Sequence, residues 1–153
     1  MLRMWARLSF TAGTVAFVLL AVAATRAQDD DEGKSPLAKI MKKIDTETKA
    51  IKAATATNKN FKESGKNKAV VASAKALIDL GKQARKFEEP SKKMNKPFEK
   101  WTDLSDRYIT AAGELIPVAE KGDINATRKA YTSLNNTCSN CHGAFRPSVD
   151  DGF

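Results

Sequence analysis

Both cysteines of the chain and its only histidine lie in one pentapeptide, Cys138-Ser139-Asn140-Cys141-His142. The pattern Cys-x-x-Cys-His is the attachment motif of c-type haem. In that chemistry two thiols add to the two vinyl groups of haem, and the histidine supplies the proximal iron ligand. The motif therefore predicts one covalently bound haem c, attached through Cys138 and Cys141, with His142 as the metal ligand.

Other uses of the pentapeptide explain fewer of its residues. A redox pair of the thioredoxin type requires a βαβ context, and no strand pattern lies near the motif. A structural zinc site needs four ligands, whereas Cys and His side chains supply at most three here. A plain disulfide in an exported helical protein is the third alternative, but it gives His142 no role.

The first 27 residues resemble a secretory signal peptide. Arg3 and Arg7 form a basic start, and an almost wholly apolar stretch follows them to residue 24. We expect cleavage after residue 27, with a second candidate site near residue 23 and an uncleaved membrane anchor as the alternative. Residues 28–34 form a polar segment that we expect to be disordered. Export is consistent with haem attachment, because cytochrome c maturation takes place in the periplasm.

The charge of the chain limits its partners. The formal net charge is +8, and the expected leader contains three of the 26 basic residues and none of the 18 acidic ones. The remainder is therefore still mildly basic, which suits acidic redox partners. Its lysines are scattered and form no Arg-rich stripe, so we expect no nucleic-acid binding. We also expect no membrane span once the signal is removed.

Four helical patterns follow the leader, and no convincing strand pattern is present. Ser35 as an N-cap and Pro36 in the first turn begin the first pattern, and Asp123 as an N-cap begins the fourth. We expect Pro117 to kink the third helix late or to end it early, and Pro147 to stop the fourth. The expected helices run from 35 to about 57, from about 67 to 87 with a break at 89–91, from 97 onward, and from 123 to 146.

These lengths predict an all-α fold, an antiparallel up-down-up-down four-helix bundle with covalent haem near one end. The haem-binding domain spans 35–146, and 147–153 form a C-terminal tail. Steps of three and four residues place Cys138, Cys141 and His142 on one helix face, close to the helix end. In an antiparallel bundle, we expect the pocket around them to be built from residues near 36–48, 84–104 and 131–146.

The sixth iron ligand is an open question at this point. Because His142 is the only histidine, a second histidine ligand is excluded. Met41 lies on the apolar stripe of the first helix, level with His142 across the bundle, so it is the preferred candidate. Its alternative is an ordinary core side chain. Met94 lies at the same end of the bundle but in a charged segment, which we expect to be a loop, and an open distal site is the remaining alternative.

The sequence Cys138 to Arg146, Cys-x-x-Cys-His-x-x-Phe-Arg on the last of four helices, resembles the class II c-type cytochromes, the cytochrome c-prime superfamily. Within that superfamily, the segment Leu37 to Lys43 around Met41 resembles the low-spin branch with His/Met ligation. The resemblance implies that Arg146 lies on the proximal side of the haem and Trp101 near the haem. We include Phe98 and Phe145 in the haem environment, where core packing and haem contact coincide.

We expect a periplasmic monohaem electron-transfer protein rather than an enzyme. No nucleophile–base pair or acid–base pair is apparent in the sequence. The alternative is a five-coordinate haem protein that binds nitric oxide or carbon monoxide. The sequence leaves open whether the protein is a monomer or a homodimer.

Overall fold

The computed structural model describes residues 35–57 and 61–146. These residues belong to one unit that spans Asp31–Phe153. The expected signal peptide at 1–27, the polar segment at 28–34 and the tail at 147–153 lie outside the described residues, as does Pro147. The described part of the chain is almost entirely helical and contains no strand, which confirms the all-α prediction.

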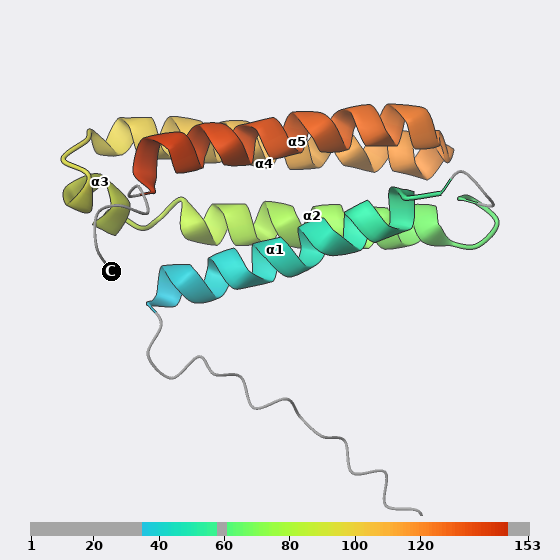
Figure 1. Ribbon diagram of the computed structural model, residues 1–153, viewed down its shortest axis with the longest axis horizontal. Coiled ribbons are helices and arrows are strands. Elements are labelled where there is room, and N and C mark those ends of the chain that lie inside the picture. The colour runs from blue at the N-terminus through green and yellow to red at the C-terminus, as the bar shows by residue number, and fades with distance from the viewer. Residues whose placement is uncertain (1–34, 58–60, 147–153) are drawn as a thin grey trace, which may run out of the picture. The chain divides into compact units, whose positions relative to one another are not determined.

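Four long helices run antiparallel in chain order, with a short fifth helix between the second and third (Figure 1). This arrangement confirms the predicted up-down-up-down bundle. It places the N-terminus of the first helix, the C-terminus of the second and the C-terminus of the last at one end of the bundle. The helices are α1 (Pro36–Thr55), α2 (Lys66–Ala84), α3 (Glu89–Lys93), α4 (Phe98–Lys121) and α5 (Ile124–Phe145).

The helix ends follow the capping residues that the sequence offers. The Ser35 side chain accepts a hydrogen bond of 3.2 Å from the Ala38 backbone N–H, and the Asp123 side chain accepts one of 2.9 Å from that of Ala126. Gly122 ends α4 with a φ of 77°, a left-handed conformation that glycine adopts without a Cβ penalty. The predicted N-caps of the first and last helices are therefore confirmed.

Two local features differ in part from what the sequence led us to expect. Segment 89–91 does more than break the second helix: after α2 ends at Ala84, Glu89–Lys93 forms α3 with Pro90 in its first turn. Proline is favoured at this position because a backbone N–H in the first turn of a helix has no acceptor within the helix, so its absence costs nothing. Pro117 also does not end α4, which continues to Lys121. The buried residues Leu115 and Ala119 flank it, so packing of this segment outweighs the lost backbone hydrogen bond.

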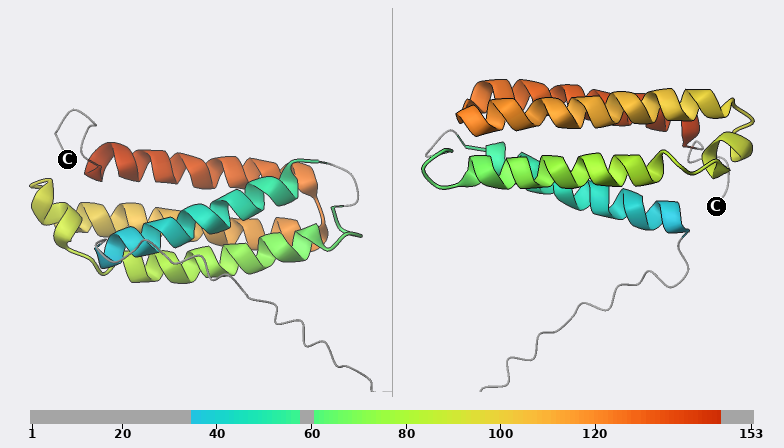
Figure 2. Two further views of the ribbon diagram at one scale, coloured as in Figure 1. Left: turned by 60° about the horizontal axis from the view of Figure 1, so that its bottom comes forward. Right: turned by 180° about the vertical axis from the view of Figure 1, so that it is seen from behind.

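The apolar core fills the half of the bundle away from the Cys-x-x-Cys-His motif. α4 packs closely against α2 and α5, and α1 packs against α2 but meets α5 at few points. Figures 1 and 2 show the N-terminal half of α1 leaning away from α5. No helix in the described ranges is long and apolar enough to cross a membrane. The core residues are Ile51, Phe61, Val70, Ala74, Leu77, Tyr108, Ala111, Ala112, Leu115, Ala119 and Leu134.

Candidate haem site

Two hollows lie at the end of the bundle that carries the motif. The inner one has a volume of about 210 Å³ and extends between the helices to Tyr108. The outer one, of about 490 Å³, reaches Ser35 at the start of α1 and Arg146 at the end of α5. Residues from 35–48, 81–108 and 135–146 line them, which agrees with the three segments expected to form the pocket. Four side chains line both hollows: Met41, Trp101, Cys141 and His142.

The last three turns of α5 present the motif to these hollows. Cys138 and Cys141 are half-buried free thiols, and Cys138 also packs against the apolar core. Burial raises the pKa of the Cys138 thiol. Burial first, and then the neighbouring Cys138, raises the pKa of Cys141 to about 11. Both thiols are therefore protonated near neutral pH, and they would lose their ionisable protons altogether on forming thioethers.

His142 is exposed and lines both hollows. Partial burial, and secondarily the charge of Arg146, lowers the pKa of its imidazole. Both causes favour the neutral ring, which is the form that offers a nitrogen lone pair to a metal. The described residues contain no group of three or more His, Cys, Asp or Glu side chains that could hold a metal ion. A metal at His142 would thus need further ligands, such as those of a porphyrin.

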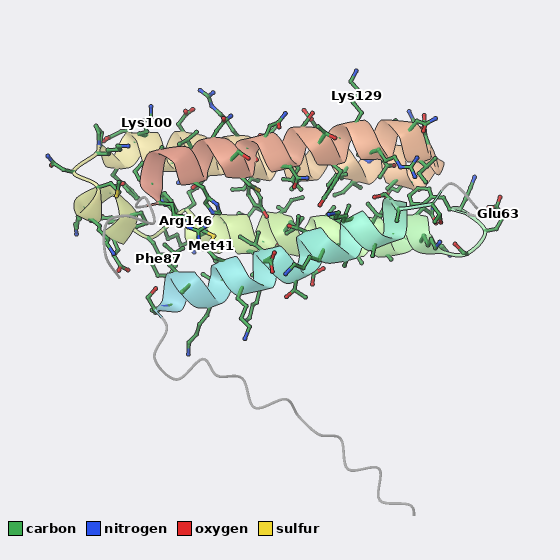
Figure 3. All side chains as sticks on the ribbon, viewed as in Figure 1. Met41, Glu63, Phe87, Lys100, Lys129 and Arg146 are labelled. Carbon is green, nitrogen blue, oxygen red and sulfur yellow. The ribbon has the colours of Figure 1, made fainter. Side chains whose placement is uncertain are left out.

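Met41 reaches the hollows from α1, opposite α5. Figure 3 shows its side chain in the space between α1 and α5, at the end of the bundle where Arg146 also lies. Ile44 and Thr48, three and seven residues further along α1, line the inner hollow beside it. Met94 is the residue that caps the C-terminus of α3, and it lines neither hollow. Of the two candidate methionines, Met41 is the one whose side chain faces the same space as His142.

Aromatic residues close the wall between α4 and α5. Trp101 is 3% exposed, and its indole N–H donates a hydrogen bond of 3.2 Å to the Ala84 carbonyl at the end of α2. The ring of Phe145 meets the indole edge to face, with centroids 5.2 Å apart. Trp101 thus lines both hollows and Phe145 lines the outer one, and their contact with haem stays a prediction.

Arg146 and Phe98, the other two residues expected near the haem, lie at different depressions of the surface. Arg146 is exposed and lines the outer hollow together with His142. Phe98 lines neither hollow; it borders a separate depression beside α3, lined by residues between Glu88 and Pro97. Its position one turn before Trp101, at the beginning of α4, explains the difference, because the chain there turns toward α3. The structure therefore places Phe98 away from the two hollows, and its contact with haem stays a prediction.

The inner hollow is also lined by Tyr108, a residue that was not expected in the pocket from the sequence. Tyr108 is 8% exposed and lines this hollow, yet its hydroxyl has no hydrogen-bond partner among the described residues. The hydroxyls of Thr48, Ser105 and Thr137, in contrast, each donate to a carbonyl of their own helix. A phenol on an otherwise apolar stripe was the available signal, because a buried hydroxyl requires a partner.

The residues present fit a haem group. The hollows are lined mainly by apolar side chains, and both thiols and the histidine lie at their wall. Tyr108 lines the inner hollow, and its buried hydroxyl has no hydrogen-bond partner among the described residues. A ligand that fills this half of the bundle would extend the apolar core, which the protein side chains complete only in the other half. Cys138 and Cys141 would attach the group, and His142 would bind its iron.

A four-helix bundle with Cys-x-x-Cys-His at the end of its last helix, facing such a pocket, defines a class of c-type cytochrome. The family model described as Cytochrome C′ matches residues 38–146. The chain therefore belongs to the cytochrome c′ family, and the family implies a covalently bound haem c. No curated protein and no solved structure gives a significant match to the chain.

Proposed function

We propose that this protein is a periplasmic electron carrier with one haem c, whose iron is bound by His142 and Met41. The observation that carries the proposal is that these two side chains, from α5 and α1, line the same two hollows. The haem, when bound, supplies an iron that changes its charge by one electron. The protein side chains determine how that iron is held and how far water reaches it.

The position of Met41 supports a ligand role over a purely structural one. A buried core methionine would be packed among apolar side chains, whereas Met41 is half-buried and borders open space in both hollows. Thioether ligation together with histidine raises the reduction potential of haem iron. It also keeps the coordination unchanged between oxidation states, so that little reorganises when an electron moves. That property suits a carrier and involves no catalytic step.

The charges around the outer hollow support an acidic redox partner. Lys93 and Arg146 line this hollow, with Glu89 as its acidic member. Three lysines on the first two turns of α1 add positive charge at the same end of the bundle: Lys39, Lys42 and Lys43. Positive charge at this end of the bundle raises the rate of encounter with a negatively charged protein. Location in the periplasm rests on the leader-like first 27 residues and on the export that is general for this family.

An optical spectrum of the matured protein tests the proposed ligation. We expect a low-spin, six-coordinate spectrum in both oxidation states, and slow or weak binding of carbon monoxide to the ferrous protein, because the gas must displace a bond. A high-spin spectrum with immediate carbon monoxide binding would contradict Met41 ligation. It would favour the alternative, a five-coordinate protein that binds nitric oxide or carbon monoxide.

A further inference from the structure

We propose that Lys96 is a positioning residue of the haem site, whose ammonium group holds the last turn of α5 and thereby fixes the orientation of His142. This inference rests on haem binding by His142, and it does not depend on the identity of the sixth ligand. Lys96 lies in the connection between α3 and α4, and it is half-buried although it is a lysine.

Two contacts join Lys96 to the end of α5. Its Nζ donates a hydrogen bond of 2.5 Å to the Ala144 carbonyl oxygen, 48 residues further along the chain. The same ammonium lies 5.7 Å from the centroid of the Phe145 ring. The last carbonyls of a helix have no partner within the helix and form its negative end. A lysine at this position satisfies one of them and places a positive charge where the helix favours it.

Local interactions fix the backbone around Lys96, and with it the position of the Lys96 Cα atom. Asn95 has a φ of 47°, a left-handed conformation that asparagine tolerates better than most residues. The Lys96 N–H then donates a hydrogen bond of 2.9 Å to the Ser91 carbonyl in α3. Pro97 follows as the N-cap of α4. Because both neighbours restrict the backbone, less conformational freedom is lost when the long side chain meets α5.

Through a series of contacts, Lys96 is connected to α5, α4 and α2. The ring of Phe145 contacts both the ammonium of Lys96 and the indole of Trp101, and Trp101 in turn is hydrogen-bonded to Ala84 of α2. The Arg146 N–H donates a bond of 2.9 Å to the His142 carbonyl, so His142 belongs to the same final turn. Movement of this turn would change the direction of the His142 ring, and Lys96 is the connection from the α3–α4 segment that opposes it.

The experiment uses the matured haem protein with Lys96→Met, which keeps an apolar stem of similar length but removes the donor and the charge. Lys100→Met is the matched control, since Lys100 is exposed on the first turn of α4 and projects from the outer side of the bundle (Figure 3). Removing either positive charge should lower the reduction potential, because positive charge favours the reduced iron. The readouts are the potential and the NMR shifts of the haem methyl groups, which report the orientation of the axial histidine.

We expect Lys96→Met to shift the haem methyl resonances and to lower the potential more than Lys100→Met does. Lys96→Arg should restore both readouts, because a guanidinium also donates to a carbonyl and carries the charge. Lys96→Gln is a milder change that keeps an N–H donor but removes the charge. Its potential and methyl shifts should lie between those of Lys96→Met and Lys96→Arg, and it replaces Lys96→Met in the test if that variant matures poorly. Equal potentials and unchanged methyl shifts in the Lys96 and Lys100 variants would overturn the proposal. A high-spin wild type would refute only Met41 ligation.

Discussion

Gly81 of α2 lies directly against the ring of Tyr108 of α4. A Cβ atom built on Gly81 would lie 2.9 Å from two carbons of that ring and 2.9 Å from Cγ1 of Ile109. Only glycine therefore permits α2 and α4 to approach this closely beside the inner hollow. Because the contact supports the ring of Tyr108 at the wall of the inner hollow, the helix spacing and the shape of this hollow depend on the same residue.

Gly81→Ala should destabilise the folded protein. The added methyl group must displace a rigid ring, and overpacking of this kind costs about 1–3 kcal/mol of the free energy of unfolding. Urea unfolding of the haem protein measures the effect. Gly113→Ala is the control, since nothing lies within 4 Å of a Cβ at that position of α4. There the better helix propensity of alanine should stabilise the protein by up to about 1 kcal/mol. Equal effects of the two substitutions would contradict the close contact.

Tyr108→Phe should change how stability depends on alkaline pH. Burial, and to a lesser degree the neighbouring Cys138, raises the pKa of the folded Tyr108 phenol above its ordinary value of about 10. The contribution of this group to stability is therefore fully present below about pH 10 and is lost as pH rises through the folded pKa, because the unfolded chain releases the proton first. Wild type should lose stability above about pH 10 more steeply than the variant does.

The measurement is the free energy of unfolding by urea at several pH values from neutral to about 11. The other titrating groups are common to both proteins, so their effects cancel in the difference between them. Parallel curves for wild type and Tyr108→Phe would show that the phenol ionises equally easily in the folded and unfolded chains, against its burial beside the inner hollow.

Met41→Ala should convert the haem from low-spin to high-spin. The substitution removes the proposed thioether ligand and leaves space beside the iron, so ferrous protein should bind carbon monoxide readily and the reduction potential should fall. Optical spectra and potentiometry measure these changes. Met94→Ala is the matched control, because Met94 caps α3 and lines neither hollow. If Met94→Ala produced the spin change instead, the assignment of the ligand to α1 would be wrong.

Haem should remain attached to the chain after denaturation. Protein matured in a periplasm able to assemble cytochromes c should keep its colour through acid-acetone extraction and denaturing electrophoresis, because thioether bonds to Cys138 and Cys141 survive both. Cys138→Ala and Cys141→Ala should each retain haem poorly under the same treatment. Loss of all colour from the wild type would contradict covalent attachment.

Electron transfer with an acidic partner should slow as salt is added. Exposed charges are screened over about 8 Å at physiological ionic strength, so attraction between the lysines of this end and a negative partner weakens. Stopped-flow rates at increasing salt measure the effect, and an uncharged small reductant serves as the control. A rate that stays constant with the acidic partner would show that these lysines only solvate the surface.

The sequence by itself predicted the chemistry of haem attachment and determined the helical order. Cys138, Cys141 and His142 are close in the chain, so a local rule of helix periodicity suffices to place them on one face. The caps at Ser35 and Asp123 are likewise local, because their side chains bond to backbone groups three residues away. Four amphipathic patterns with short connections then leave an antiparallel bundle as the simplest fold.

The tertiary structure decided what lies around the motif. Phe98 and Trp101 are aromatic residues one turn apart, yet only Trp101 lines the pocket, since Phe98 is the first residue of α4 and borders the depression beside α3. α4 continues past Pro117 because burial on both sides of it outweighs a local preference. The contact of Lys96 with Ala144 joins residues 48 positions apart, and the approach of Gly81 to Tyr108 joins two helices. Such pairings depend on where whole helices lie, which no local pattern of residues encodes.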